Sequence, residues 1–203
     1  MTIALIGATG FIGSRILSEL VSRGHEVAAI VRNAGKVPAL PGVTAVKGDI
    51  FDRDGLAGLL AGHEAVISSV HYLASDADAL LGAVKQSGVT RYLVVGGAGS
   101  LEVAPGVKLV DTPEFPAIYL DEARKGGAYL DRLKQEKALD WTFLSPSAMI
   151  APGERTGTFR LGLDQLLVDA KGESRISAED YAIALVDELE QPAHNRRRFT
   201  VGY

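Results

Sequence analysis

Apolar residues follow two different spacings along this chain. Short runs rich in Val, Ile, Leu and Ala are typical of buried strands, and they occupy residues 2–6, 26–31, 43–47, 65–69, 91–95 and 141–144. Between these runs, apolar residues recur every three or four positions, which predicts helices over residues 11–23, 54–61, 76–87, 118–137 and 178–190. Residues 199–201 can add a final strand. Strands that alternate with helices in this way predict βαβ units, and therefore an α/β fold with a parallel sheet.

Two stretches, residues 101–116 and 151–172, interrupt the alternation. They carry turn signals and only short strand candidates, and irregular segments of this length in a compact domain are commonly functional. No repeat, linker or low-complexity tract divides the chain. We therefore expect one domain over residues 1–203, a doubly wound parallel sheet with small C-terminal elaborations.

A glycine-rich loop joins the first predicted strand to the first predicted helix. It reads Gly7-Ala8-Thr9-Gly10-Phe11-Ile12-Gly13, the spacing G-x-x-G-x-x-G. Gly7 permits a tight exit from the strand, Gly10 lets the backbone approach a pyrophosphate, and Gly13 lets the helix pack closely. Because strand, turn and helix follow in the order that this motif needs, we expect a Rossmann-type dinucleotide site rather than a merely structural turn. The expected cofactor contacts in this loop are Gly7, Thr9, Gly10, Phe11, Ile12 and Gly13.

The end of the second predicted strand bears on which dinucleotide is bound. NAD sites place Asp or Glu there to accept hydrogen bonds from the ribose 2′-hydroxyl, whereas a 2′-phosphate needs a cation. This chain has Val31-Arg32-Asn33. Arg32 can hold the phosphate with a planar, charged fork, and Asn33, Lys36 and Arg15 are candidate helpers. We therefore expect NADP(H) in preference to NAD(H), although an arginine here can also be an ordinary solvated side chain.

Two further strand ends are candidates to line the cofactor, since ligands of open α/β sheets lie across the carboxyl ends of the strands. Asp49 and Ile50 follow the third predicted strand and can contact the adenine. Ser68 and Ser69 end the fourth, beside the expected ribose and pyrophosphate. Either pair can equally be ordinary loop chemistry.

Composition excludes several classes of function. The 203 residues include no Cys and only four His, without metal-ligand spacing, so we expect neither a thiolate nucleophile nor a metal site. The formal net charge is −4 and no long basic tract is present, which argues against a nucleic-acid partner; we interpret Arg196-Arg197-Arg198 as a solvated face. We expect no membrane partner and a cytoplasmic location, because no apolar stretch reaches spanning length and residues 1–13 lack the features of a signal peptide. No feature predicts a particular oligomeric state.

Several motifs together resemble the atypical short-chain dehydrogenases/reductases. They are the glycine loop, Val31-Arg32-Asn33, Gly48-Asp49-Ile50, the run Val94-Val95-Gly96-Gly97-Ala98-Gly99-Ser100, and Leu144-Ser145-Pro146. Blocks over residues 152–157 and 175–182 extend the likeness along nearly the whole chain and are more specific than the glycine loop. The chain most resembles the branch of NAD(P)H-binding proteins described as NADH-flavin reductases, which is similar to biliverdin reductase B and more distantly to the NmrA-like cofactor sensors.

The resemblance implies a Rossmann core with NADPH across the strand ends and hydride transfer to a flat acceptor such as FMN, riboflavin or a quinone. It places Gly97 and Pro146 beside the cofactor, Ser100 at the superfamily's active-site serine, and Tyr119 over the nicotinamide. From the residues alone, Ser100 can equally be a turn serine and Tyr119 an aromatic at the edge of the core.

The superfamily's Tyr-x-x-x-Lys pair, in which the lysine lowers the pKa of the phenol, is absent from this chain. Tyr119 and Lys125 are six residues apart and face different sides of a helix, while Lys125 and Tyr129 stand in the reverse order. A reductase that only orients its cofactor and acceptor needs no such pair. Two alternatives stay open: a protein that senses NADP(H) and regulates a partner without turnover, and, less favoured, a nucleotide-sugar epimerase or dehydratase.

Overall fold

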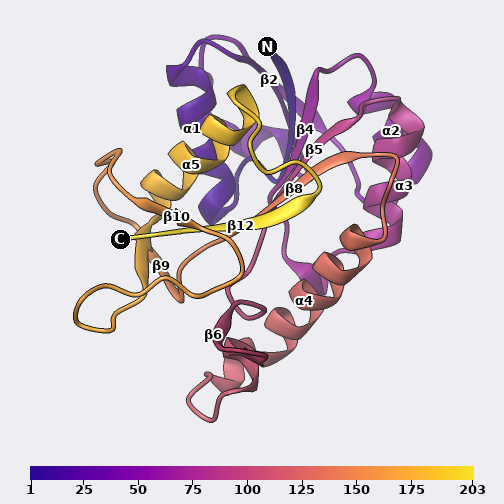
Figure 1. The fold of residues 1–203 in the computed structure, drawn as a ribbon. Coiled ribbons are helices and arrows are strands. Elements are labelled where there is room, and N and C mark those ends of the chain that lie inside the picture. Colours follow the sequence, from indigo (N-terminus) through magenta and orange to yellow (C-terminus); the bar gives the residue numbers. More distant parts are fainter.

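The protein is built on one large sheet whose strands are mostly parallel. In the computed structural model, which describes residues 1–203, the strands of this sheet are β1 (Thr2–Ile6), β2 (Glu26–Val31), β3 (Val43–Lys47), β4 (Ala65–Ser68), β5 (Arg91–Val95), β8 (Asp140–Ser145), β10 (Arg160–Gly162) and β12 (Arg197–Gly202). Their order is β10-β12-β8-β5-β4-β1-β2-β3, and every neighbouring pair is parallel except β10 with β12. This order confirms the predicted doubly wound, Rossmann-type sheet (Figure 1).

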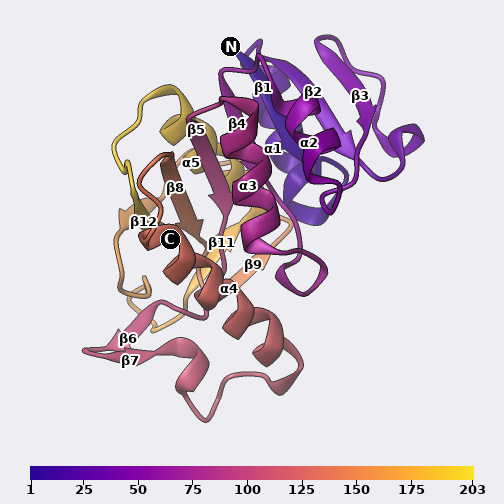
Figure 2. The same cartoon turned by 90° about the vertical axis from the view of Figure 1, so that its right-hand side faces the viewer.

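Helices cover both faces of the sheet. They are α1 (Phe11–Ser22), α2 (Arg53–Leu60), α3 (Ala77–Ser87), α4 (Leu120–Lys134) and α5 (Ala178–Glu190). α1 and α5 pack together on one face, while α2, α3 and α4 lie on the other (Figures 1 and 2). No helix is both long and apolar enough to cross a membrane.

The predicted helices are all present, but α4 is shorter than expected at both ends. Residues Ala117–Tyr119 form a separate 3₁₀ turn, η4, directly after Pro116, so α4 begins at Leu120 rather than at residue 118. At the other end, the Glu136 carboxylate accepts a hydrogen bond from the Ala138 N–H at 2.8 Å. That local turn competes with a further helical turn, and α4 ends at Lys134 rather than at residue 137.

Strand β1 shows why the sheet is covered on both sides. Ile3 and Leu5 belong to the apolar cluster beneath α1 and α5, whereas Ala4 and Ile6 belong to the cluster beneath α2, α3 and α4. Successive side chains of a strand point to opposite faces, so a strand that is apolar at every position is buried from both sides. The continuous apolar runs in the sequence therefore predicted these strands correctly.

The strand order reverses between β1 and β4, and ligands of open α/β sheets bind in the crevice at such a point. The hairpin of β6 (Glu102–Ala104) and β7 (Val107–Lys108) extends beyond the carboxyl edge of the sheet, followed by the short helix η3 (Leu109–Asp111) (Figure 2). A separate parallel pair, β9 (Met149–Ala151) and β11 (Arg175–Ser177), follows β8 at that edge. The first irregular stretch thus lies beyond the carboxyl edge of the sheet, whereas the second runs between β9 and β11 and contributes β10, the edge strand next to β12.

Two adjacent glycines in α4 have different surroundings. A Cβ atom on Gly126 would lie 2.8 Å from Cε2 of Tyr72, whereas the nearest atom to a Cβ on Gly127 would be Ser100 Cβ at 3.8 Å. The Tyr72 ring is held in place because its hydroxyl donates to the Val95 carbonyl oxygen at 2.7 Å. Close packing of α4 against Tyr72 therefore requires glycine at position 126 but not at position 127.

We expect Gly126→Ala to destabilise the protein by about 1–3 kcal/mol, because the added methyl group overpacks against a fixed ring. Gly127→Ala serves as the matched control, and it should stabilise by about 0.5–1 kcal/mol because alanine is the better helix former. Urea unfolding of both variants and the wild type measures the difference. Equal effects at the two positions would show that α4 does not depend on this contact.

Candidate dinucleotide and active site

Glycine is required at two positions of the loop after β1. Gly7 has φ = +85°, and a Cβ atom there would lie 2.0 Å from the carbonyl oxygen of Ser69. A Cβ atom on Gly13 would lie 2.1 Å from the Gly7 carbonyl oxygen. Gly10 is less restricted, because its Cβ atom would approach that oxygen only to 3.3 Å. The close packing that Gly13 permits is thus packing of the helix against the loop itself.

The start of α1 presents backbone N–H groups that have no partner in the protein. Gly10 is the N-cap residue and has no side chain to accept a hydrogen bond, and the first turn contains no acidic residue. The N–H groups without a protein acceptor are those of Ala8, Thr9, Phe11, Ile12 and Gly13. By contrast, α2, α3 and α5 are capped by the side chains of Asp52, Asp76 and Ser177. The start of α1 therefore offers donors and a positive dipole end to an anion, as a diphosphate requires.

The end of β2 places a cation near this loop. Arg32 is exposed and its side chain makes no ion pair or hydrogen bond within the protein, and the side chain of Lys36 is equally free. Asn33 accepts a hydrogen bond from the Gly35 N–H at 3.1 Å, so it caps the 3₁₀ turn η1 (Ala34–Lys36). Arg15, considered above as a helper, instead pairs with Glu179 at 3.1 Å. Arg32 and Lys36 are the cations left for a phosphate.

The ends of β3 and β4 differ in what they offer a ligand. Asp49 is exposed, and its carboxylate accepts a hydrogen bond from the Phe51 N–H at 2.9 Å, while Ile50 packs on the apolar cluster of α2 and α3. The Ser68 hydroxyl is buried and bonded to the Tyr92 hydroxyl at 2.8 Å, so it points into the core and not into the crevice. Ser69 lies against Gly7 and approaches it through its backbone carbonyl. Any contact of Ser68 with a cofactor would therefore be made by its backbone.

The glycines after β5 do not all clear space for a ligand. Cβ atoms on Gly96 and Gly99 would lie 2.3 Å from Phe143 and 2.7 Å from Ala123, so these two glycines accommodate the protein's own packing. Gly97 is open, with its nearest neighbour at 4.0 Å. The Ser145 hydroxyl donates to the Gly97 carbonyl oxygen at 2.9 Å and joins the ends of β5 and β8, where Pro146 follows.

Ser100 is held by a buried arginine that the sequence did not reveal. The Arg198 guanidinium donates to Ser100 Oγ at 3.1 Å and to Asp164 Oδ1 at 2.6 and 2.9 Å. Its side chain is only 5% exposed, so the interpretation of Arg196-Arg197-Arg198 as a solvated face is wrong for Arg198. Because Oγ accepts this bond, the Ser100 hydroxyl proton is free to be donated elsewhere.

The structure does not bring the two expected catalytic residues together. Ser100 lies beside Gly127, whereas Tyr119 precedes α4 by one residue and is 61% exposed. Eight helical residues correspond to about 12 Å along the helix axis. The Lys125–Tyr129 pair offers no accessible phenol: the Tyr129 hydroxyl is buried at 2.7 Å from that of Tyr92, and burial holds its pKa well above the ordinary value.

Comparison with known proteins identifies the family. A model for NAD(P)H-binding proteins matches residues 7–192. The chain belongs to this NAD(P)H-binding family. It is 46% identical over 211 residues to YwnB of Bacillus subtilis, across 99% of this chain and 98% of that protein.

Two solved structures superpose along the whole chain. A candidate epimerase from Bacteroides thetaiotaomicron has a TM-score of 0.94 at 43% identity, covering 100% of this chain and 96% of that one. A candidate NADH-flavin reductase from Streptococcus pneumoniae has a TM-score of 0.85 at 36% identity, covering 100% and 99%. The resemblance to the flavin-reductase branch that the sequence predicted is thereby confirmed.

We expect Arg32→Ala to weaken NADPH binding by about 1.5–3 kcal/mol, the range for a hydrogen bond to a charged group, and to leave NADH binding nearly unchanged. Titration calorimetry with both dinucleotides measures this. Arg197→Ala is the matched control, because Arg197 is exposed and unpaired at the opposite end of the parallel strands. Equal losses for NADPH and NADH would show that Arg32 does not contact the 2′-phosphate.

Proposed function

We propose that this protein is an NADPH-dependent oxidoreductase that transfers hydride to a flat acceptor such as FMN, riboflavin or a quinone. The observation that carries the proposal is the set of free N–H groups at the start of α1 together with the unpaired Arg32. The first suits a diphosphate and the second a 2′-phosphate. Bound NADPH would supply a hydride that, with one proton from solvent, reduces the acceptor by two electrons. Because the cytoplasm regenerates NADPH, we also place the protein there.

The residues at the ends of β5 and β8 would position the nicotinamide. Gly97 leaves open space, and Pro146 borders it from the next strand, which Ser145 ties to Gly97. In this arrangement Asp49 and Ile50 would lie near the adenine, and Ser69 near the ribose and pyrophosphate. The resemblance to a candidate NADH-flavin reductase over the full chain supports a flavin-like acceptor.

Ser100 is our candidate hydrogen-bond donor at the reacting end. The guanidinium of Arg198 fixes the serine side chain and withdraws electron density from its oxygen, which strengthens the free O–H as a donor. Tyr119 is our candidate for a contact with the flavin or quinone that accepts the hydride, because its side chain is exposed and its hydroxyl has no partner in the protein. In this proposal neither Ser100 nor Tyr119 acts as a general base.

Epimerase chemistry is disfavoured although one similar structure is described as a candidate epimerase. That chemistry needs a phenol activated by a lysine, and this chain buries Tyr129 in its core while Lys125 donates to the Ser75 carbonyl oxygen. A reductase of flat acceptors needs mainly orientation and exclusion of water.

We expect purified protein to oxidise NADPH only when FMN, riboflavin or menadione is added, as followed by the absorbance of the reduced nicotinamide.

Gly10→Asp should fold normally, because Gly10 has the extended backbone of an N-cap residue (φ −72°, ψ 172°), yet it should bind NADPH at least about tenfold more weakly. Its carboxylate would occupy the N–H groups and repel the diphosphate.

Gly10→Ala is the neutral control for that variant, since it adds the Cβ atom without the charge. Tight NADPH binding by the wild type without turnover on any acceptor would refute the reductase and favour the cofactor sensor.

We expect Ser100→Ala to lower kcat by about tenfold, the cost of one hydrogen bond in the transition state, with the KM for NADPH unchanged. Arg198→Met should reproduce this loss, and Arg198→Lys should recover part of it by keeping a cationic donor. Ser18→Ala, on the exposed side of α1, is the control. Wild-type kcat in Ser100→Ala would assign Ser100 a structural role only.

A further inference from the structure

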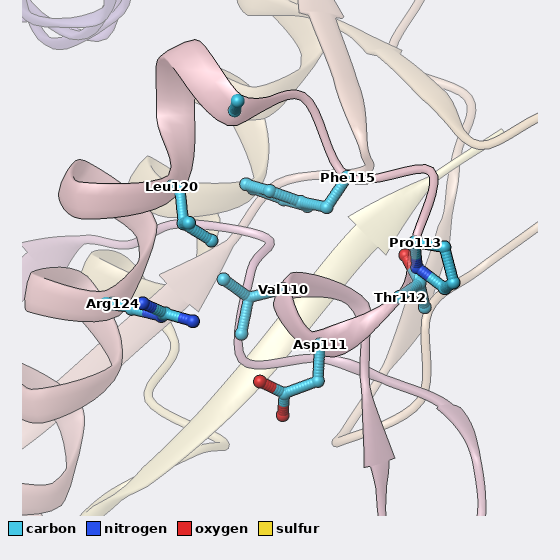
Figure 3. A pocket seen from close by; sticks show the side chains of 8 residues that line it. Val110, Asp111, Thr112, Pro113, Phe115, Leu120 and Arg124 are labelled. Carbon is cyan, nitrogen blue, oxygen red and sulfur yellow. The ribbon is translucent and has the colours of Figure 1, made fainter.

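A cavity of about 340 Å³ lies between η3, η4 and the first turns of α4. This size is within the usual range for sites that bind small molecules. Figure 3 shows Phe115 and Leu120 above Val110, with Arg124 below Leu120 on the same helix and Asp111 below Val110. Its lining residues are Val110, Asp111, Thr112, Pro113, Phe115, Ala117, Leu120 and Arg124.

The floor of this cavity rests on the segment that follows β5. The Val110 N–H donates to the Gly99 carbonyl oxygen at 2.9 Å, and Val110 Cβ would lie 3.4 Å from a Cβ atom on Gly99. Gly99 directly precedes Ser100 and follows the open backbone at Gly97 by two residues. The cavity wall at Val110 is therefore hydrogen-bonded to the backbone two residues beyond the place proposed for the nicotinamide.

The two charged residues of the cavity are both free to bind a ligand. Arg124 and Asp111 form no ion pair with each other within 4.0 Å, and neither makes a side-chain hydrogen bond elsewhere in the protein. The remaining polar residue, Thr112, already donates its hydroxyl to the Leu109 carbonyl oxygen at 2.8 Å. The cavity thus combines apolar side chains with one group that only donates and one that only accepts.

This combination is complementary to a flat ring whose edge carries a carbonyl next to an N–H group. The imide edge of a flavin has both, whereas a simple quinone has carbonyl acceptors only, so the carboxylate of Asp111 would find no partner on it. Burying the ring against Val110, Phe115 and Leu120 would add the apolar contact that flat heteroaromatic ligands require.

We propose that this cavity binds the imide edge of a flavin acceptor, with Arg124 donating to a ring carbonyl and Asp111 accepting from the ring N3–H. Reduction of the bound flavin rests on the proposed reductase function, whereas flavin binding does not, because flavin binding can be measured without turnover. Asp111 then acts as a specificity residue that favours flavins over quinones, whereas Arg124 can donate to a carbonyl of either ring.

Riboflavin and 3-methylriboflavin, which lacks the N3–H, are the probes, and quenching of flavin fluorescence on binding to the full chain is the readout. The wild type should bind riboflavin about tenfold more tightly than 3-methylriboflavin, the difference of one hydrogen bond to a charged group. Asp111→Ala should bring that ratio to about one. Arg124→Met should weaken both flavins about tenfold, and its NADPH binding should stay unchanged.

Lys108→Ala is the matched control, because it removes an exposed cation from the same segment outside the cavity. Arg124 and Asp111 are themselves exposed, so the variants should unfold at the wild-type temperature. The proposal is overturned if the wild type binds no riboflavin, if it binds both flavins equally, or if Arg124→Met behaves like Lys108→Ala.

Menadione separates this inference from the reductase function. With quinone as acceptor, turnover in Asp111→Ala should match the wild type while riboflavin reduction falls, because a quinone has no N–H group from which the carboxylate could accept. Flavin binding with the expected ratios but no turnover on any acceptor would reject the reductase and keep the flavin site. Turnover on all acceptors that is unaffected by either substitution would keep the reductase and reject the site.

Discussion

The close contact between the Gly7 carbonyl and the start of α1 is the constraint on which the site depends. Gly13 meets that oxygen where any Cβ atom would collide, and the Gly10 N–H donates to the same oxygen at 3.0 Å. The helix must therefore begin immediately after the loop, without a capping side chain. Its first N–H groups stay unsatisfied by the protein, which lowers the local stability of the helix but leaves them for an anion. Helices α2, α3 and α5 do not leave such N–H groups for an anion, because Asp or Ser side chains already accept hydrogen bonds from their first turns.

The C-terminal elaboration is attached to that same helix. Glu19 of α1 is buried, and hydrogen bonds from Arg155 and Arg23 hold its pKa below the ordinary value despite the opposing effect of burial. Arg155 donates two hydrogen bonds of 2.8 Å to this carboxylate, and the Gly153 N–H donates to Glu179 at 2.8 Å. Residues 152–158 are therefore fixed against α1 and α5 by charged contacts, so that the segment after β9 has a defined position relative to the cofactor helix.

Local sequence patterns predicted the structural features that depend on residues close together along the chain. The strand bounds of β1, β2, β3 and β5, and helix α5, follow from apolar spacing, and the glycine loop from its place between strand and helix. The errors involve partners that are distant in sequence. Ser68 turns inward, where its hydroxyl is hydrogen-bonded to the hydroxyl of Tyr92 on the neighbouring strand. No pattern near residue 198 indicates that Asp164 and Ser100 will neutralise and bind that arginine.

The buried tyrosines explain why the site can lack a phenol that transfers protons. The Tyr181 hydroxyl donates to the Leu144 carbonyl oxygen at 2.7 Å and accepts from the Gly96 N–H at 3.3 Å, so it connects the ends of β8 and β5. Tyr72 holds β5 in the same way through Val95. Burial raises the pKa of both hydroxyls above the ordinary value, so they remain neutral hydrogen-bond donors at neutral pH. Their effect is to hold rigid the strand ends that would carry the nicotinamide. Rigid orientation is the main protein contribution that hydride transfer between two flat rings requires, which is why a reductase function is compatible with a site that has no Tyr-x-x-x-Lys pair.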